Sequence, residues 1–386
     1  MMRVSAVHRV ALFGALVGAA ASAANGAGYT AIDLTPGGYS GANALAVDGS
    51  AQVGSATSAS GNDHAVLWNG SSSTYTDLHP AAADASAILG VSGNLLVGQE
   101  VIGSISHAGY WSGGSFQLLP ESGNGTSIAL GVSGTLIVGS AGGTSHAVVW
   151  TGTPATGYTL TDLHSTITPP GYITSQASAT DGTLVAGSVF VDSATDSAEH
   201  AAVWNLATST FVDLQAAGGI TDSTAQGVHG NQVVGIAAPT DSGAHAMLWL
   251  WDGQDYVRTD LNPAGAALSA ANATNGIEQV GTVGDDISAP AQAYVWSETV
   301  DASNHVTSVN AVDLQLVLQA NPQTQDLVSS YAQGIDAQGD IVGYGIDGLG
   351  NLHAVLWLAH APEPATLSVL GTGALLLVRR RTKRSR

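Results

Sequence analysis

The chain contains no cysteine, which excludes disulfide bonds and thiol chemistry. It is almost as poor in basic residues: two of the nine lie before residue 24 and six lie after residue 378, so Arg258 stands alone between them. One arginine against 28 acidic residues gives residues 24–361 a formal charge of −27. Nucleic acid and anionic lipid bind proteins first through cationic contacts, so this charge excludes both as partners.

Two further absences narrow the function. The sequence has no G-x-S-x-G, P-loop or H-E-x-x-H motif, and its serines and threonines are too abundant for one to stand out. No segment between the two ends is apolar over the ~20 residues that a membrane span needs. Neutral glycan, calcium-mediated contact and a basic protein remain open as partners, whereas a polyanionic glycan would be repelled unless divalent cations bridged it.

The chain repeats one motif seven times, most often as His-Ala-x-x-Trp, and seven of its eight tryptophans end a copy. A repeat every ~40 to 50 residues predicts a propeller or an array. The residues that begin and end the seven copies are His64 and Trp68, His107 and Trp111, His146 and Trp150, His200 and Trp204, His245 and Trp249, Gln292 and Trp296, and His353 and Trp357.

Each repeat divides into four short strands. The first is rich in small residues and leads through an x-Gly turn to a second that ends in Val-Gly; the third carries the His/Trp motif and the fourth carries Asp-Leu. One position, two residues before each turn, holds only Ala or Gly, which suits an inner strand near a central axis. The residues at that position are Ala46, Gly90, Gly131, Ala179, Gly227, Ala273 and Gly334.

The strand count predicts a closed ring. The seventh repeat ends after Trp357 without an Asp-Leu strand, and Tyr29 to Leu34, which match Tyr75 to Leu78, supply one. An N-terminal strand in the last blade would leave no open edge. We therefore predict an all-β fold: a seven-bladed β-propeller of four-stranded blades over residues 24–361, closed by the N-terminal strand and followed by a C-terminal hydrophobic helix. A core of this size needs no covalent cross-links.

Residues 31–357 resemble the HAF repeat, a bacterial extracellular repeat named for a His-Ala-Phe core. Here Trp closes the strand and the third letter of the His-containing copies is Val, Gly, Ala or Met, so the resemblance is to the pattern of the repeat. It implies a secreted or surface protein and brings no established chemistry.

The N-terminus reads as a signal peptide over residues 1–23. Arg3 and Arg9 precede a short apolar run. The run leads to Ala21-Ser22-Ala23, a small-residue cleavage site in which Ala21 and Ala23 occupy the positions that signal peptidase recognises. A membrane anchor is the alternative, but the apolar run is shorter than a span requires. We expect signal peptidase to remove this segment during export.

The C-terminus, residues 362–386, joins Pro362-Glu363-Pro364 to an apolar stretch and a basic tail. This order closely resembles the PEP-CTERM sorting signal. A short transmembrane helix with cytoplasmic basic residues would hold an inner-membrane precursor. The resemblance implies recognition by an exosortase, removal of the tail, and a final location at the cell surface or outside the cell in a bacterium that makes exopolysaccharide. A plain tail anchor is the alternative.

The repeated histidines invite a metal hypothesis, but sheets pack ~10 Å apart whereas ligands of one zinc ion lie ~2 Å from it. A structural hydrogen bond to the Asp of the Asp-Leu strand, as in WD-repeat blades, explains a residue that recurs in every unit. The Asp-Leu carboxylates could serve glycoside hydrolysis as a pair, yet six copies at one strand position favour structure. Gln117-Leu118 replaces the Asp-Leu pair in the second repeat, and the hairpin turns alone explain Asp48, Asp181 and Asp336. We assign no residue a catalytic role.

Departures from the repeat indicate function more directly. Trp251 and Tyr256 lie beside acidic residues and the lone Arg258, a combination that suits sugar stacking and also suits an ordinary loop. Calcium is the only cofactor that the sequence leaves open, because oxygen ligands gather in two loops although no complete calcium-loop motif is present. The calcium candidates are Asp192, Asp196, Glu199, Asp285 and Asp286.

Two hypotheses follow. The first is an exported, exosortase-processed propeller that binds exopolysaccharide or a surface protein without catalysis. The second is a secreted propeller hydrolase or lyase that acts on polysaccharide, for which we expect non-repeating acids or histidines with shifted pKa values at one mouth of the channel.

Overall fold

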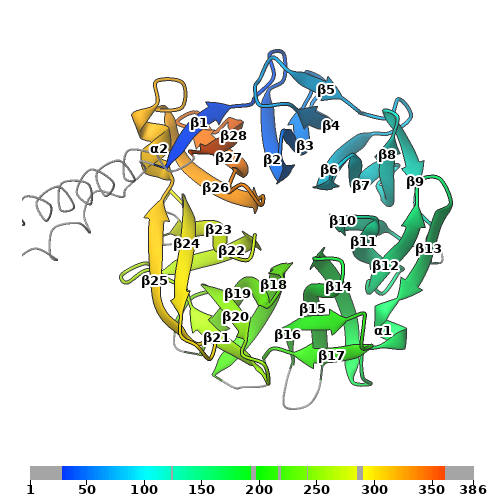
Figure 1. Ribbon diagram of the computed structural model, residues 1–386. Helices are drawn as coiled ribbons and strands as arrows, with labels where there is room; N and C mark the ends of the chain where they lie inside the picture. The colour runs from blue at the N-terminus through cyan, green and yellow to red at the C-terminus, as the bar shows by residue number, and fades with distance from the viewer. Residues whose placement is uncertain are drawn as a thin grey trace, which may run out of the picture.

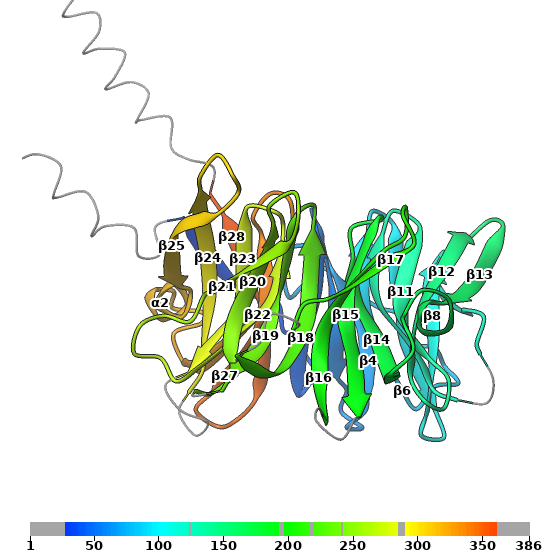
Figure 2. The ribbon, with the colours of Figure 1, turned by 90° about the horizontal axis from the view of Figure 1, so that it is seen from below.

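Seven four-stranded antiparallel sheets surround a central axis in the computed structural model, which describes residues 28–122, 125–192, 197–215, 219–240, 242–284 and 290–360 (Figure 1). Seen from the side, the sheets stand next to one another in a single layer (Figure 2). The predicted fold class, an all-β seven-bladed propeller, is therefore confirmed.

The first four blades follow the chain in order. Blade 1 contains β2 (Gly41–Asp48), β3 (Ala51–Thr57), β4 (Asp63–Trp68) and β5 (Tyr75–Asp77). Blade 2 contains β6 (Ala85–Ser92), β7 (Leu95–Ile102), β8 (Ile105–Ser112) and β9 (Ser115–Leu118). Blade 3 contains β10 (Ser127–Ser133), β11 (Leu136–Ala141), β12 (His146–Thr153) and β13 (Gly157–Asp162), and blade 4 contains β14 (Tyr172–Thr180), β15 (Leu184–Asp192), β16 (Ser197–Asn205) and β17 (Thr210–Asp213).

The remaining blades complete the circle. Blade 5 contains β18 (Ile220–His229), β19 (Gln232–Pro239), β20 (His245–Trp251) and β21 (Tyr256–Asp260). Blade 6 contains β22 (Leu268–Thr274), β23 (Glu278–Gly284), β24 (Gln292–Val300) and β25 (Val306–Asp313). Blade 7 contains β26 (Leu327–Ile335), β27 (Ile341–Asp347), β28 (Leu352–Ala359) and β1 (Tyr29–Asp33), and two short helices, α1 (Leu163–Thr166) and α2 (Gln315–Ala320), lie between blades.

The ring is closed by β1, as the sequence predicts. This strand pairs antiparallel with β28 from Tyr29↔Ala359 to Asp33↔Val355, so the first strand of the chain is the outermost strand of the last blade (Figure 1). The pairing removes the free edge that β28 would otherwise present.

A β-bulge in every inner strand explains the Val-Gly motif. The register shifts at one equivalent place in all seven blades, for example between Ala44 and Ala46. A Cβ added to the facing glycine would lie 1.9–2.1 Å from a carbonyl oxygen of the inner strand, so only glycine fits. These glycines are Gly54, Gly98, Gly139, Gly187, Gly235, Gly281 and Gly343.

The Ala/Gly position lies where neighbouring inner strands approach each other. A Cβ on Gly227 would lie 3.0 Å from the Cα of Ala273 in the next blade, and one on Gly131 would lie 3.1 Å from the Cα of Ala179. The strands enclose an axial cavity of about 220 Å³. Among the described residues that line it, none is Asp, Glu or His.

The hairpin turns also connect the blades. Asp48 accepts a hydrogen bond from the Gly93 N–H of the next blade at 2.6 Å, and Asp336 accepts one from the Gly49 N–H at 3.0 Å. Asp181 does the same for the Gly230 N–H at 3.1 Å. The sequence explains these aspartates by turn geometry alone, which is incomplete because each also satisfies a backbone donor of its neighbour.

Neither described helix is long and apolar enough to cross a bilayer. The predicted signal peptide (residues 1–23), the sorting signal (residues 362–386) and its hydrophobic helix lie outside the described residues.

Replacement of a glycine that faces an inner-strand bulge should destabilise the ring. In Gly187→Ala the new methyl would lie 1.9 Å from the Gln176 carbonyl oxygen, so β14 and β15 must separate. We expect a loss of about 3 kcal/mol in the free energy of unfolding, measured by chemical denaturation. Gly37→Ala, where no atom lies within 4 Å of the new methyl, is the control. Equal stability of the two variants would contradict the packing argument.

Candidate functional site

The histidine at the head of the third strand bonds to a carboxylate in six blades. Each Nδ1 donates to an acidic oxygen, and five of the six acids belong to the Asp-Leu strand, as expected for a structural hydrogen bond; in blade 6 Gln292 replaces the histidine. The pairs are His64–Asp77 (2.8 Å), His107–Glu121 (2.8 Å), His146–Asp162 (2.8 Å), His200–Asp213 (2.7 Å), His245–Asp260 (2.7 Å) and His353–Asp33 (3.0 Å).

A second hydrogen bond joins the third strand of six blades to the next blade. The buried N–H of Ala65, beside His64, donates to the Ser86 hydroxyl on the inner strand of blade 2 at 2.9 Å. Equivalent bonds of 2.8–3.0 Å reach five further serines, whereas in blade 7 the Ala354 N–H donates to Thr35, just beyond β1 of the same blade, at 3.1 Å. These serines are Ser127, Ser175, Ser223, Ser269 and Ser330.

The partners of these serines assign a tautomer to two histidines. Ser223 donates to the Gln215 carbonyl oxygen and Ser269 to the Asn262 carbonyl oxygen, both at 2.6 Å. In blades 1 and 3 the equivalent partners are the Nδ1 atoms of His79 and His164, at 2.9 Å from Ser86 and Ser175. By analogy with Ser223 and Ser269 we assign Ser86 and Ser175 as donors to Nδ1, which makes both imidazoles neutral with their proton on Nε2.

Blade 2 departs from this arrangement. The sequence aligns Gln117-Leu118 with Asp-Leu, but the pairing of Leu118 with Gly109 places Leu118 at the aspartate position, so that alignment is wrong by one residue. Glu121 compensates: its Oε1 accepts from His107 at 2.8 Å and from Ser127 at 2.9 Å. One carboxylate thereby performs the tasks of both Asp77 and His79.

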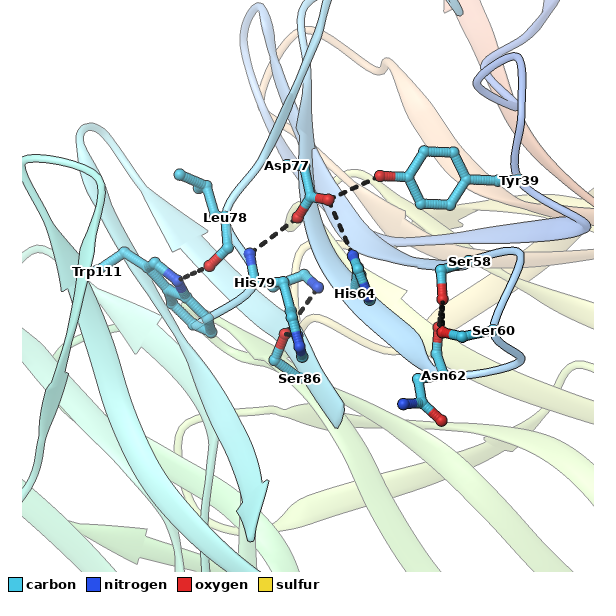
Figure 3. Close-up of polar contacts among 11 residues, drawn as sticks. Tyr39, Ser58, Ser60, Asn62, His64, Asp77, Leu78, His79, Ser86 and Trp111 are labelled. Atoms are coloured by element: carbon cyan, nitrogen blue, oxygen red, sulfur yellow. Dashed lines mark hydrogen bonds and ion pairs between the residues drawn. The ribbon is translucent and has the colours of Figure 1, made fainter. Parts of the chain in front are cut away.

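These networks resemble a Ser-His-Asp constellation in composition only. Figure 3 shows Ser86, His79, His64 and Asp77 between blades 1 and 2, with Trp111 donating its Nε1–H to the Leu78 carbonyl oxygen at 2.8 Å. Ser86 is 2% exposed and both functions of its hydroxyl are in use, so a substrate cannot reach it. No group of three or more His, Asp or Glu side chains in the described part of the chain is placed to hold a metal ion.

The network shifts the pKa values of its members. Burial lowers the pKa of His79, and His64, whose ring stacks on it at 4.0 Å, lowers it further; burial and His146 lower the pKa of His164 in the same way. Burial alone would raise the pKa of Asp77, but hydrogen bonds from His64, the His79 N–H and Tyr39 hold it below its usual range.

The predicted sugar-stacking residues line a groove between blades 4 and 5. Trp251 and Tyr256 meet edge to face, with ring centroids 5.2 Å apart, and form one wall of a cavity of about 240 Å³. Asn205, Thr210 and Asn231 contribute polar groups to its lining. Burial, with Asp181 adding to it, raises the pKa of Tyr256 to about 12, so its hydroxyl stays a proton donor. We call this cavity the Trp251 groove.

The remaining candidates of blade 5 lie near the groove rather than in it. Arg258 follows Tyr256 by two residues on β21, and its guanidinium reaches to about 4.0 Å from the Cβ position of Gly219. Asp252 lies 3.8 Å from His305 on the long β24–β25 hairpin. Backbone N–H groups of Asp255 and Gln254 lower the pKa of Asp252, so this acid anchors its own loop.

The calcium candidates are only partly described. Glu199 accepts a hydrogen bond from the Ser188 hydroxyl at 2.6 Å, and Asp192 lies exposed at the end of β15. Asp196, Asp285 and Asp286 lie outside the described residues. Calcium binding therefore stays a prediction.

Sequence reasoning missed Glu100. This residue lies on β7 opposite His107, is only 8% exposed, and lines a cleft of about 720 Å³ between blades 1 and 2. Burial raises its pKa, with His107 opposing that shift. The signal was in the repeat: the equivalent position is apolar or glycine in the six other blades, so a glutamate there marks a departure that structure does not require.

Replacement of His79 and His164, the two histidines that accept a hydrogen bond from a serine, should flatten the pH dependence of stability. Their folded-state pKa values lie below the unfolded value of about 6.5, so they favour folding above that pH, and this contribution is lost as the pH falls through the folded-state pKa values. His79→Gln/His164→Gln copies the glutamine of blade 4 and keeps the acceptor. We expect similar stability at pH 8 and a smaller loss than wild type between about pH 7 and 5, measured by thermal denaturation. Identical profiles would contradict the assignment.

No family model matches this chain, and no curated protein sequence matches it. Among solved structures it is similar to one described as a polysaccharide lyase of a new family, an ulvan lyase. The two share 8% sequence identity with a TM-score of 0.46, over 83% of this chain and 95% of the other. A likeness of this degree supports no argument about function.

Proposed function

We propose that this propeller is an exported, exosortase-processed module of the cell surface or extracellular matrix that binds exopolysaccharide without catalysis. The observation that carries the proposal is the Trp251 groove, where two aromatic rings from blade 5 face amide and hydroxyl groups of blades 4 and 5. Aromatic rings contact the apolar faces of sugars, and a few polar groups then fix the orientation of the ligand. The sequences of residues 1–23 and 362–386 support the export and sorting part of the proposal.

The distribution of titratable groups supports binding over catalysis. A hydrolase or lyase was expected to gather non-repeating acids or histidines at a mouth of the channel, and the described lining of the axial cavity contains none. The repeated His and Asp residues are engaged with each other in six blades. Neutral glycans suit a surface of formal charge −27 better than acidic ones do.

Loss of the aromatic wall should weaken glycan binding. With residues 24–361 and a neutral fraction of the host exopolysaccharide, Trp251→Ala should reduce affinity on the order of tenfold, because it removes the apolar surface that a sugar ring covers. Trp251→Phe should retain most of the binding. Affinity is measured by calorimetry, and the polymer mass is followed in the same samples.

The control for this test is Tyr75→Ala, an exposed aromatic residue of blade 1 away from the groove. Unchanged affinity of Trp251→Ala would reject the groove as the glycan site. Shortening of the polymer by wild-type protein would reject the binding proposal in favour of a hydrolase or lyase.

Changes in the sorting signal should arrest processing. Replacement of Pro362-Glu363-Pro364 by alanines should leave a membrane-held precursor that retains its basic tail, because the exosortase recognises this motif. The measurement is the mass and membrane fraction of the chain in a host that carries the exosortase. Release of a chain with the same mass as the processed wild type would reject the sorting assignment.

A further inference from the structure

One blade contains a carboxylate that the fold does not need. Six blades place a small residue opposite the head of the third strand, whereas blade 2 places Glu100 there. The equivalent residues are Ala56, Ala141, Val189, Ala237, Val283 and Gly345. The fold therefore forms with no polar group at this position.

Glu100 has no partner of its own. None of the hydrogen bonds of the described residues reaches its carboxylate, whose oxygens contact solvent in the cleft although the residue as a whole is only 8% exposed. The Nδ1 of His107, across the strand pair, is already bonded to Glu121. Partial burial of the Glu100 carboxyl disfavours its charged form and raises its pKa.

The surroundings of Glu100 form a cleft that opens beside the outer strand of blade 2. Pro80 and Ala81, which follow blade 1, lie on one side, and Phe116 and the 59%-exposed Leu118 lie on the other. Leu118 occupies the position where other blades have an aspartate, so this wall is apolar in blade 2 alone. The cleft holds about 720 Å³, and Glu100 lies in it among both polar and apolar groups.

We propose that this cleft binds the ammonium group of an amine-bearing ligand, with Glu100 as its counter-ion. An ammonium group supplies both the hydrogen bonds and the charge that the carboxylate lacks. The formal charge of −27 over residues 24–361 attracts cations to the whole propeller. The apolar surface of Pro80, Phe116 and Leu118 accepts the carbon frame that carries the amine, which is either an amino-sugar ring or a lysine side chain. This site is separate from the Trp251 groove, so the two proposals stand or fall independently.

The test compares ligands that carry ammonium groups with a ligand in which those groups are neutralised. Calorimetry on residues 24–361 at 0.15 M salt uses a tetramer of glucosamine, the same tetramer fully N-acetylated, and N-acetyl-lysine amide. We expect wild type to bind at least one of the two amines and to bind the N-acetylated tetramer at least about tenfold more weakly. Glu100→Gln should lose about tenfold in amine affinity. Asp326→Asn, which removes an equal charge from an exposed position, should change little.

Stability measurements separate a binding residue from a structural one. Glu100→Val installs the residue type of blades 4 and 6, so we expect its thermal midpoint to rise by a few degrees while amine binding is lost. Binding of the lysine arm alone would support the proposal with a protein partner as the source of the amine. Equal amine affinity of wild type and Glu100→Gln, a lower midpoint for Glu100→Val, or Glu100-dependent cleavage of the glucosamine tetramer would each overturn it.

Discussion

The buried N–H at the second position of the His-Ala motif must find an acceptor, and in six blades the acceptor comes from the next blade. A backbone donor left without a partner in a protein interior costs about 1–3 kcal/mol. Ser86 and its five equivalents meet this requirement between consecutive blades, and Thr35, just beyond the closing strand β1, meets it in blade 7. Because the serine bond crosses six of the seven blade boundaries, it fixes those sheets against their neighbours, and the pairing of β1 with β28 closes the ring.

The requirement also explains residues that otherwise differ from blade to blade. In blades 1 to 5 the serine hydroxyl also donates onward, so the residue beyond the fourth strand only needs an acceptor atom. His79, Gln215 and Asn262 all provide one, and Glu121 provides one from a different position. The residue at this position therefore differs between blades, but its role as a hydrogen-bond acceptor is the same. Only residues that fall outside this role remain as candidates for function.

Much of the fold could be predicted from the sequence because the repeat reports backbone geometry. The recurrent glycine of the second strand marks a bulge that no side chain tolerates, and the match between Tyr29 and Tyr75 reports the closing strand. The alignment of Gln117-Leu118 failed because letters were matched without the strand pairing that sets side-chain direction. The turn aspartates were only half explained for a related reason, since the backbone N–H groups that donate to them belong to the neighbouring blade.

The candidate sites were less predictable, because a site is made of residues from two blades whose approach no single repeat encodes. Trp251 and Tyr256 stood out by chemistry alone, but the polar groups of Asn205 and Thr210 that face them come from blade 4. Glu100 was overlooked because an acid is unremarkable in a chain with so many, and the strand pairing that shows apolar or glycine equivalents in the other blades is needed to set it apart. The charge then gives the two sites different physics. A stacking groove for an uncharged ring responds little to ionic strength, whereas a buried counter-ion within a strongly acidic propeller draws amines from a distance and weakens as salt screens that field. A glycan that carries both neutral and amine-bearing rings would engage the two sites of one propeller through different forces, and the separation of the sites around the ring would then select for chain length.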